Sequence, residues 1–374
     1  MEIQRIKFDD HKEHWHLIET HLDHFNLLVG ISGVGKTLIT EVIKLISQVA
    51  TSNDYQLDSI EWKIGFVHEE QAYQWELKST KADSPNDLLR LLKESTQIVY
   101  EKIFNATTQE IIAERSKDFF SFKHENINPS LNKHESILTL FSEDETIDTI
   151  RKAFQSVIFS EQAPHNERLG FSSPVNFNAI TFKDIKKTLI NGPLLVKAFF
   201  LQKFYQNYFI EIKQHLISLF PSLSDLRVDL TEENRQHYKL FFRFQERDTD
   251  HWIHQNRMSS GMFRTLTHLI EISLAPKGSV IVIDEFENSL GINCMPDLVT
   301  FILSHAPNLQ FIITSHHPYV INNIPWHTWK LVKRHRNRVY VNPAKDIPEF
   351  NEEESFHEKF IQLINHPDYR QGVL

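Results

Sequence analysis

The segment from Gly30 to Thr37 has the residue types and spacing needed to hold a chain of phosphates. It reads Gly-Ile-Ser-Gly-Val-Gly-Lys-Thr and fits the pattern G-x-x-x-x-G-K-[ST], in which glycines let backbone N–H groups approach phosphate oxygens. The chain has only 10 glycines, so their concentration in this segment is informative. The apolar run Leu27–Val29 before the segment and a helical pattern after it supply the flanking strand and helix. The sequence therefore predicts a nucleotide-binding site.

Two side chains of this loop would act on the nucleotide directly. Lys36 would contact the β- and γ-phosphates, and Thr37 would ligate a magnesium ion. The residues expected to bind ATP here are Gly30, Ile31, Ser32, Gly33, Val34, Gly35, Lys36, Thr37 and Leu38.

A pair of carboxylates follows an apolar run in the last third of the chain. Residues Gly278–Glu285 read Gly-Ser-Val-Ile-Val-Ile-Asp-Glu, which is typical of a buried strand with acidic residues at its end. Asp284 would belong to the magnesium shell, and Glu285 would orient and deprotonate the attacking water. The alternative is a solvated acidic strand end without a catalytic role.

Two further segments resemble motifs of the ABC-type ATPases. Met258–Met262 resembles the signature loop Leu-Ser-Gly-Gly-Gln, and a helical pattern over Phe263–Ile272 follows it. The resemblance implies that Ser259, Ser260 and Gly261 bind the γ-phosphate held by an opposite subunit, which suits the preference of helix N-termini for anions. An ordinary serine helix cap is the alternative.

The second resembling segment is Ser315-His316-His317-Pro318, which follows the apolar strand Phe311–Thr314. His316 occupies the place of the family's switch histidine, which implies a contact with the γ-phosphate. Asn288–Gly291 occupies the place of the D-loop without its usual aspartate. The Q-loop glutamine is left open among Gln71, Gln109 and Gln162.

The whole chain resembles ABC-type ATPases of the RecF, OLD and SMC-like branch, especially short bacterial AAA-domain proteins found near effector or nuclease genes. This resemblance implies ATP and Mg²⁺ as cofactors and a head-to-tail homodimer with two composite sites. It also implies control of a separate effector protein, a nuclease or toxin, in antiviral defence. A DNA-repair ATPase that clamps DNA is the alternative. Its strongest feature is the five Lys and Arg residues within Lys330–Arg338, although a solvated hairpin turn is the simpler explanation of them.

The elements that must position these residues indicate an α/β protein with an ABC-ATPase head, a mixed sheet with a P-loop core, an antiparallel β subdomain and a largely helical insertion or lid. Alternating polar and apolar residues predict the early strands, and a stripe of apolar residues predicts a helix from Leu38. The expected strands of the N-terminal part are 2–7, 14–19, Phe25–Val29, Glu61–His68, Ala72–Ser79, Ile98–Asn105 and Glu110–Arg115. Later expectations are helices at Pro85–Lys93, Glu145–Ser156 and Pro193–Phe220, and strands at Arg227–Leu230, Tyr238–Arg247 and Trp252–His254.

Four domain ranges follow from this pattern. They are an N-terminal ATPase lobe (1–99), an insertion or helical lid (100–225), a C-terminal ATPase lobe with the signature loop, carboxylates and switch histidine (226–345), and a tail (346–374).

Composition restricts the class of protein further. A net charge of -9 argues against a uniformly basic surface that coats DNA, and Cys294 as the single cysteine rules out an intrachain disulfide. No N-terminal signal pattern is present, and the most apolar segment, Pro193–Phe220, is interrupted by charged residues. We therefore expect a cytoplasmic protein with no membrane partner.

Overall fold

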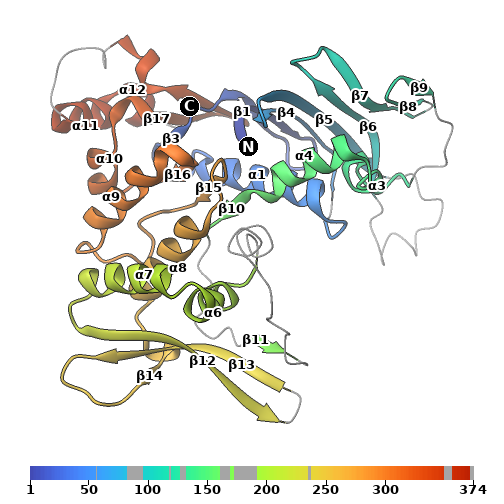
Figure 1. Cartoon of the computed structure of the whole chain (residues 1–374). Coiled ribbons are helices and arrows are strands. Elements are labelled where there is room, and N and C mark those ends of the chain that lie inside the picture. The colour runs from blue at the N-terminus through green and yellow to red at the C-terminus, as the bar shows by residue number, and fades with distance from the viewer. Residues whose placement is uncertain are drawn as a thin grey trace, which may run out of the picture. The chain divides into compact units, whose positions relative to one another are not determined.

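The computed structural model (Figure 1) describes residues 1–55, 57–81, 96–117, 119–126, 132–160, 169–171, 192–234, 237–348 and 356–370. The chain forms two compact units, which are described separately here. Unit 1 comprises residues 1–157, 278–282 and 310–374, and unit 2 comprises residues 158–277 and 283–309. Among the described residues, no helix is long and apolar enough to cross a membrane.

Unit 1 is organised by a 14-stranded sheet with the order β10-β15-β16-β3-β17-β18-β2-β1-β4-β5-β6-β7-β8-β9. The strands on the P-loop side are β3 (Phe25–Val29), β10 (Val157–Phe159), β15 (Val280–Ile283), β16 (Gln310–Thr314), β17 (Trp329–His335) and β18 (Arg338–Pro343). The remaining strands are β1 (Glu2–Asp10), β2 (Trp15–His21), β4 (Ile60–His68), β5 (Gln71–Lys81), β6 (Thr96–Asn105), β7 (Glu110–Arg115), β8 (Phe120–Phe122) and β9 (Glu125–Asn126).

The sheet is mixed. β3 pairs in parallel with β16 and β17, and β18 pairs in parallel with β2. From β2 through β1, β4, β5, β6, β7 and β8 to β9 all pairs are antiparallel. All residues of β3 and β16 are buried, which is why both strands are mainly apolar and do not alternate between polar and apolar residues. The expected combination of a mixed P-loop sheet and an antiparallel β part is confirmed.

Helices of unit 1 pack on this sheet through apolar stripes. Helix α1 (Lys36–Thr51) buries Ile39, Val42, Ile43, Ile46 and Val49 along one face, as a 3.6-residue period requires. It contacts α3 (Ile137–Leu140), α4 (Glu145–Gln155) and β16. The other helices of unit 1 are α10 (Pro318–Asn323), α11 (Phe356–Asn365) and α12 (Pro367–Arg370).

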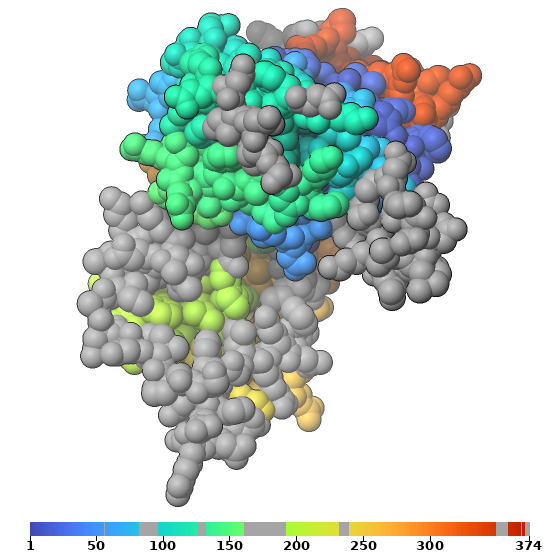
Figure 2. Space-filling model, turned by 90° about the vertical axis from the view of Figure 1, so that its right-hand side faces the viewer, coloured from blue at the N-terminus to red at the C-terminus, as the bar shows by residue number. Residues whose placement is uncertain are grey.

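An aromatic cluster fastens α4 to the antiparallel strands. The ring of Phe154 lies 5.0 Å from that of Phe66 on β4 and 5.4 Å from that of Trp75 on β5, both edge to face. Trp75 in turn meets Trp62 at 5.2 Å. All four side chains are almost completely buried, so this contact forms the core between helix and sheet. In Figure 2 the segments coloured cyan to green, which include β6, β7 and α4, lie next to one another on the surface of unit 1.

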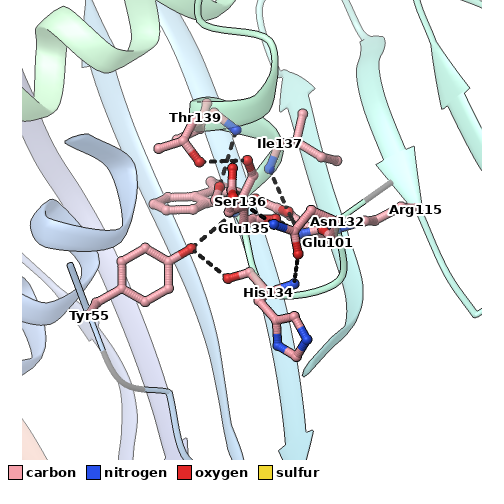
Figure 3. A network of polar contacts seen from close by, with 11 residues as sticks. Tyr55, Glu101, Arg115, Asn132, His134, Glu135, Ser136, Ile137 and Thr139 are labelled. Atoms are coloured by element: carbon pink, nitrogen blue, oxygen red, sulfur yellow. Dashed lines mark hydrogen bonds and ion pairs between the residues drawn. The ribbon is translucent and has the colours of Figure 1, made fainter. Parts of the chain in front are cut away.

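A buried polar network joins β6 and β7 to the segment before α3 (Figure 3). The carboxylate of Glu101, which is 0% exposed, accepts hydrogen bonds from Arg115 Nη2 at 2.7 Å, Trp75 Nε1 at 3.0 Å, Ser136 Oγ and the backbone N–H of Ile137. The same Arg115 side chain donates to the backbone carbonyls of residues 132 and 135. Each buried charge is therefore paired and hydrogen-bonded, as burial requires.

Tyr55 extends this network toward the end of α1. Its hydroxyl accepts from the N–H of Ser136 at 3.0 Å and donates to the carbonyl of His134 at 3.2 Å. Burial raises the pKa of the Tyr55 hydroxyl to about 12, so it remains a neutral donor.

Unit 2 contains a helical layer and a second, 4-stranded sheet. Its helices are α6 (Leu194–Phe204), α7 (Gln206–Leu219), α8 (Ser260–Leu274) and α9 (Met295–His305). The second sheet has the order β11-β13-β12, and β14 also pairs with β13. Its strands are β11 (Leu169–Phe171), β12 (Leu223–Asn234), β13 (His237–Glu246) and β14 (Ile253–His254).

The prediction of one continuous helix over Pro193–Phe220 is wrong. Pro193–Phe220 divides at Tyr205, whose φ of -134° and ψ of 54° are not helical. Helix α6 is buried on nearly all sides, whereas α7 buries only a stripe at Phe209, Ile212, Leu216 and Leu219. The break lets α6 be buried on nearly all sides while α7 is buried along one face only. Helix propensities do not indicate where such a change in burial occurs. Pro193 begins the first helix as predicted.

The other expected strands and helices that lie within the described residues are present, with shifted ends. The expectations did not include α3, α9, α10, α11, α12, β8, β9, β10 or β11. The predicted helix at Pro85–Lys93 lies outside the described residues. The compact units divide the chain differently from the expected ranges, because β6–β9 continue the sheet of unit 1 beyond residue 100. The four domain ranges expected from the sequence (1–99, 100–225, 226–345 and 346–374) remain a prediction.

We expect Arg115→Met to lower the free energy of unfolding by roughly 3 to 5 kcal/mol, because Glu101 would stay buried without its cation. Urea unfolding followed by tryptophan fluorescence measures the change. The control is Lys102→Met, whose ion pair with Glu114 spans 3.6 Å and is partly exposed, so its loss should cost about 1 kcal/mol or less. Equal effects of the two changes would show that the Glu101 network does not stabilise the sheet.

Candidate nucleotide-binding site

The phosphate loop leads from β3 into α1, and its glycines are required by the backbone. Gly35, the N-cap of α1, has φ of 105°, and a Cβ atom there would lie 2.9 Å from the Val339 side chain. At Gly30 (φ 156°) a Cβ would lie 2.6 Å from the backbone oxygen of Val332. Val34 is completely buried and anchors the loop. Side chains on these glycines would push the loop away from β17 and β18.

Polar groups of the loop are arranged to receive an anion. Lys36 Nζ donates to the backbone carbonyls of Gly30 at 2.7 Å and Ile31 at 2.9 Å, so its ammonium lies over the loop. The first turn of α1 has no acidic residue, and Ser32 and Thr37 are exposed. A helix N-terminus with a lysine and no acidic residue in its first turn favours phosphate.

His316 lies at the same sheet edge as this loop. β16 and β3 are parallel neighbours with Thr314 opposite Leu28, and the N–H of Ser315 donates to the carbonyl of Leu28 at 3.3 Å. Parallel strands end at a common edge, so the residues after Thr314 and after Val29 emerge together. His316 is exposed there, whereas His317 caps α10 by accepting from the N–H of Tyr319 at 3.2 Å. This division agrees with the assignment of the switch position to His316.

In unit 2, the signature-like residues form the start of α8. Ser259 is the N-cap, and its Oγ accepts from the N–H of Met262 at 3.2 Å. Ser259 and Ser260 are exposed, while Gly261 is buried. The serine-cap interpretation is therefore correct for Ser259; binding of a nucleotide by the same serines stays a prediction.

The paired carboxylates follow β15 directly. The strand ends at Ile283, so Asp284 and Glu285 lie in the loop after it rather than in the strand. Glu285 is exposed and has φ of 46°, a left-handed conformation that is uncommon for a residue with a side chain. Its Oε2 accepts from Asn288 Nδ2 at 3.2 Å. Hydroxyl and carboxylate oxygens, as in Thr37 and Asp284, are the donor types that Mg²⁺ prefers.

The sequence analysis missed Arg264, which contacts the carboxylate loop from α8. Its Nη2 donates to the backbone carbonyls of Asp284 and Glu285, each at 2.9 Å, and its side chain is buried. Burial lowers the pKa of Arg264, and the nearby carboxylates of Glu285, Glu287 and Asp284 oppose this shift. An arginine pKa starts so high that the side chain stays charged. The available signal was a charged side chain among the largely apolar residues of the expected helix Phe263–Ile272.

A buried histidine lies one turn further along α8. His268 Nδ1 is 2.8 Å from Ser160 Oγ, and within the described part of the chain its Nε2 has no hydrogen-bond partner. Burial, and secondarily the charge of Arg264, lowers the pKa of His268 to about 3. His268 is thus neutral in the folded protein at physiological pH.

Comparison with known proteins identifies the family. The family model described as "AAA domain, putative AbiEii toxin, Type IV TA system" matches residues 25–322. The chain belongs to this AAA-domain family. The expected resemblance to bacterial AAA-domain proteins is confirmed. No curated protein gives a significant sequence match.

Solved structures with a similar chain course are SMC head domains. An SMC head bound to the C-terminal winged-helix domain of ScpA is 12% identical, with a TM-score of 0.44, and covers 91% of this chain and 97% of its own. The SMC head domain from Thermotoga maritima is 11% identical, with a TM-score of 0.38, over 92% and 99% of the two chains. An SMC head bound to the C-terminal domain of ScpA, derived from Pyrococcus furiosus, is 11% identical, with a TM-score of 0.44, over 91% and 95%.

His268 should make the protein less stable in acid. Its pKa is depressed in the folded state, so the unfolded chain takes up a proton near the ordinary pKa of 6.5 while the folded chain does not. The stabilising contribution is complete above pH 6.5 and is lost as the pH falls from there toward 3. As the pH is lowered through this window, the free energy of unfolding of His268→Gln should fall less steeply than that of the unsubstituted protein. The two slopes should differ by up to about 1.4 kcal/mol per pH unit.

Urea midpoints between pH 7.5 and 5 measure that slope. The control is His251→Gln, which makes the same substitution at an exposed histidine of unit 2. Parallel pH profiles for His268→Gln and the unsubstituted protein would contradict the assignment of a neutral, buried histidine.

Proposed function

We propose that this AAA-domain protein hydrolyses ATP with magnesium at two composite sites in a head-to-tail homodimer. In each site, one chain supplies the loop Gly30–Leu38, Asp284, Glu285 and His316, and the other supplies Ser259, Ser260 and Gly261. ATP binding closes the dimer, and hydrolysis opens it. The observation that carries the proposal is the glycine-dependent phosphate loop of unit 1, with Lys36 over it and His316 at the same sheet edge.

Each residue has a role that its position supports. The loop amides and Lys36 bind the phosphates, Thr37 and Asp284 hold the metal ion, and His316 contacts the γ-phosphate. When bound, Mg²⁺ neutralises charge on the phosphates. Glu285 orients the attacking water and takes up its proton, a role that suits an exposed carboxylate.

The biological output proposed for this cycle is control of a separate effector protein, a nuclease or toxin, in cytoplasmic antiviral defence. The description of the family refers to a putative toxin and a toxin–antitoxin system, which supports an effector-linked role. The ATP cycle would then act as an engine or sensor that switches the effector between two states.

Glu285→Gln should preserve ATP binding, abolish turnover and accumulate a closed dimer, because the amide cannot accept the proton of the attacking water. We expect a loss of roughly 10² to 10⁴-fold in hydrolysis rate. Phosphate release and size-exclusion chromatography with ATP and magnesium measure the two effects. An unchanged hydrolysis rate would exclude Glu285 as the base.

The matched control for dimer closure is Ser259→Arg. This change places a bulky cation at an exposed helix cap, so it should block closure while leaving ATP binding by the monomer nearly intact. If Ser259→Arg has the ATPase activity of the unsubstituted protein, the site is not built from two chains.

A second candidate function is a DNA-repair ATPase that clamps DNA, and one structural observation favours it. β17 and β18 form a hairpin whose turn exposes Arg336 and Arg338, with Lys333 and Arg334 half-buried beside them. Such a cluster of cations suits contacts with DNA phosphates.

Arg336→Glu with Arg338→Glu should weaken binding to duplex DNA by about tenfold or more at low salt and reduce the salt dependence of the affinity. Fluorescence anisotropy across a salt series measures both. The control is Lys63→Glu with Lys78→Glu on β4 and β5, which makes the same charge change on another surface of unit 1. DNA binding that responds equally to both pairs, or to neither, would rule out the hairpin as the DNA site.

A further inference from the structure

The loop that follows β15 is attached to α8 at two points within unit 2. The first is the pair of hydrogen bonds from Arg264 to the carbonyls of Asp284 and Glu285. The second is the close packing of Gly261, where a Cβ atom would lie 2.7 Å from the backbone oxygen of Ser289. The first two turns of α8 therefore hold the segment Asp284–Ser289 from both of its ends.

Two residues of the attached loop have an unfavourable backbone conformation. Glu285 and Ser289 both have positive φ, 46° and 64°, and neither is glycine. A left-handed residue with a Cβ atom costs free energy and persists only when its surroundings hold it. The guanidinium of Arg264 only donates hydrogen bonds, so its burial requires acceptor oxygens nearby. The carbonyls of Asp284 and Glu285, on either side of the left-handed Cα of Glu285, are two such acceptors.

We propose that Arg264 is a positioning residue that holds the backbone of Glu285 in its left-handed conformation and thereby aims the carboxylate at the attacking water. The inference rests on the proposed role of Glu285 in hydrolysis. Arg264 acts on the carboxylate of its own chain and does not touch the nucleotide. Because Ser259 caps the same helix, α8 carries the signature-like serines at its start and contacts the loop that contains Glu285.

The decisive variants are Arg264→Met, which removes the donors at similar size, and Arg264→Lys, which keeps a cation with donors. For Arg264→Met we expect hydrolysis to fall by roughly 10²-fold, as for a misplaced catalytic group, with the dissociation constant for ATP changed by less than about threefold. It should accumulate the ATP-bound dimer as Glu285→Gln does. Arg264→Lys should recover part of the lost rate.

A readout that does not depend on hydrolysis is amide hydrogen exchange of the nucleotide-free protein. Peptides that cover Asp284–Ile292 should exchange faster in Arg264→Met than in the unsubstituted chain. The matched control replaces both members of the buried pair Lys197–Glu271, joined at 2.5 Å further along α8, by Met. This control should change thermal stability while leaving loop exchange and turnover per folded molecule unaltered.

Three outcomes would overturn the proposal. Unchanged loop exchange in Arg264→Met would show that the arginine does not hold the loop. Full turnover would show that the held conformation is irrelevant to the reaction. Loss of the ATP-dependent dimer, as expected for Ser259→Arg, would place the effect in the signature loop instead. If the unsubstituted protein neither hydrolyses ATP nor dimerises with it, the proposed function fails, whereas the exchange measurement still decides the role of Arg264 in the loop.

Discussion

The parallel pairing of β3 with β16 and β17 fixes where the phosphate loop and His316 emerge. Parallel strands cannot be joined by a short turn, so β3 and β16 come from distant parts of the sequence. Buried amides set this arrangement: Asn26 Nδ2 donates to the carbonyl of Phe311 at 3.1 Å, and Gln310 bonds the backbone of Ile3 and Asp23. These bonds satisfy polar groups that no water reaches, so a shifted register would leave them unpaired. The sheet edge at which the phosphate loop and His316 emerge depends on this register.

In unit 2, helix α8 positions the elements around it, as the parallel strands do in unit 1. It is buried along almost its full length, yet it carries Arg264, His268 and Glu271. Each of these side chains has a specific partner: the carbonyls after β15, Ser160, and Lys197. Burial raises the pKa of Glu271, which Lys197 opposes, and it lowers the pKa of His268. These three side chains lie at successive turns of α8. The helix therefore contacts both the loop that contains Asp284 and Glu285 and, through Lys197, helix α6, while Ser259 and Ser260 lie at its start.

Local sequence patterns identified most of the described helices and strands, but not the residues that these elements contact in the folded chain. The alternation in Glu110–Arg115 identified β7, although nothing local indicates that Arg115 pairs with a buried Glu101 on β6. The apolar residues of 193–220 indicated helix, yet the break at Tyr205 depends on which faces neighbouring elements cover. The pair His316-His317 left one histidine unassigned until the cap of α10 accounted for His317. In each case the missing information was the identity of a distant neighbour.

The sequence by itself determined the phosphate loop, the apolar strand before the two carboxylates, and the serine-capped helix. These features depend on glycine conformations, apolar runs and capping bonds between residues close in the chain, so the local sequence encodes them. Only the tertiary structure decided that His316 shares a sheet edge with the phosphate loop and that Arg264 donates hydrogen bonds to the backbone carbonyls of Asp284 and Glu285. Such contacts join residues far apart in the sequence, and their free energy exists only once folding has brought the strands and helices together.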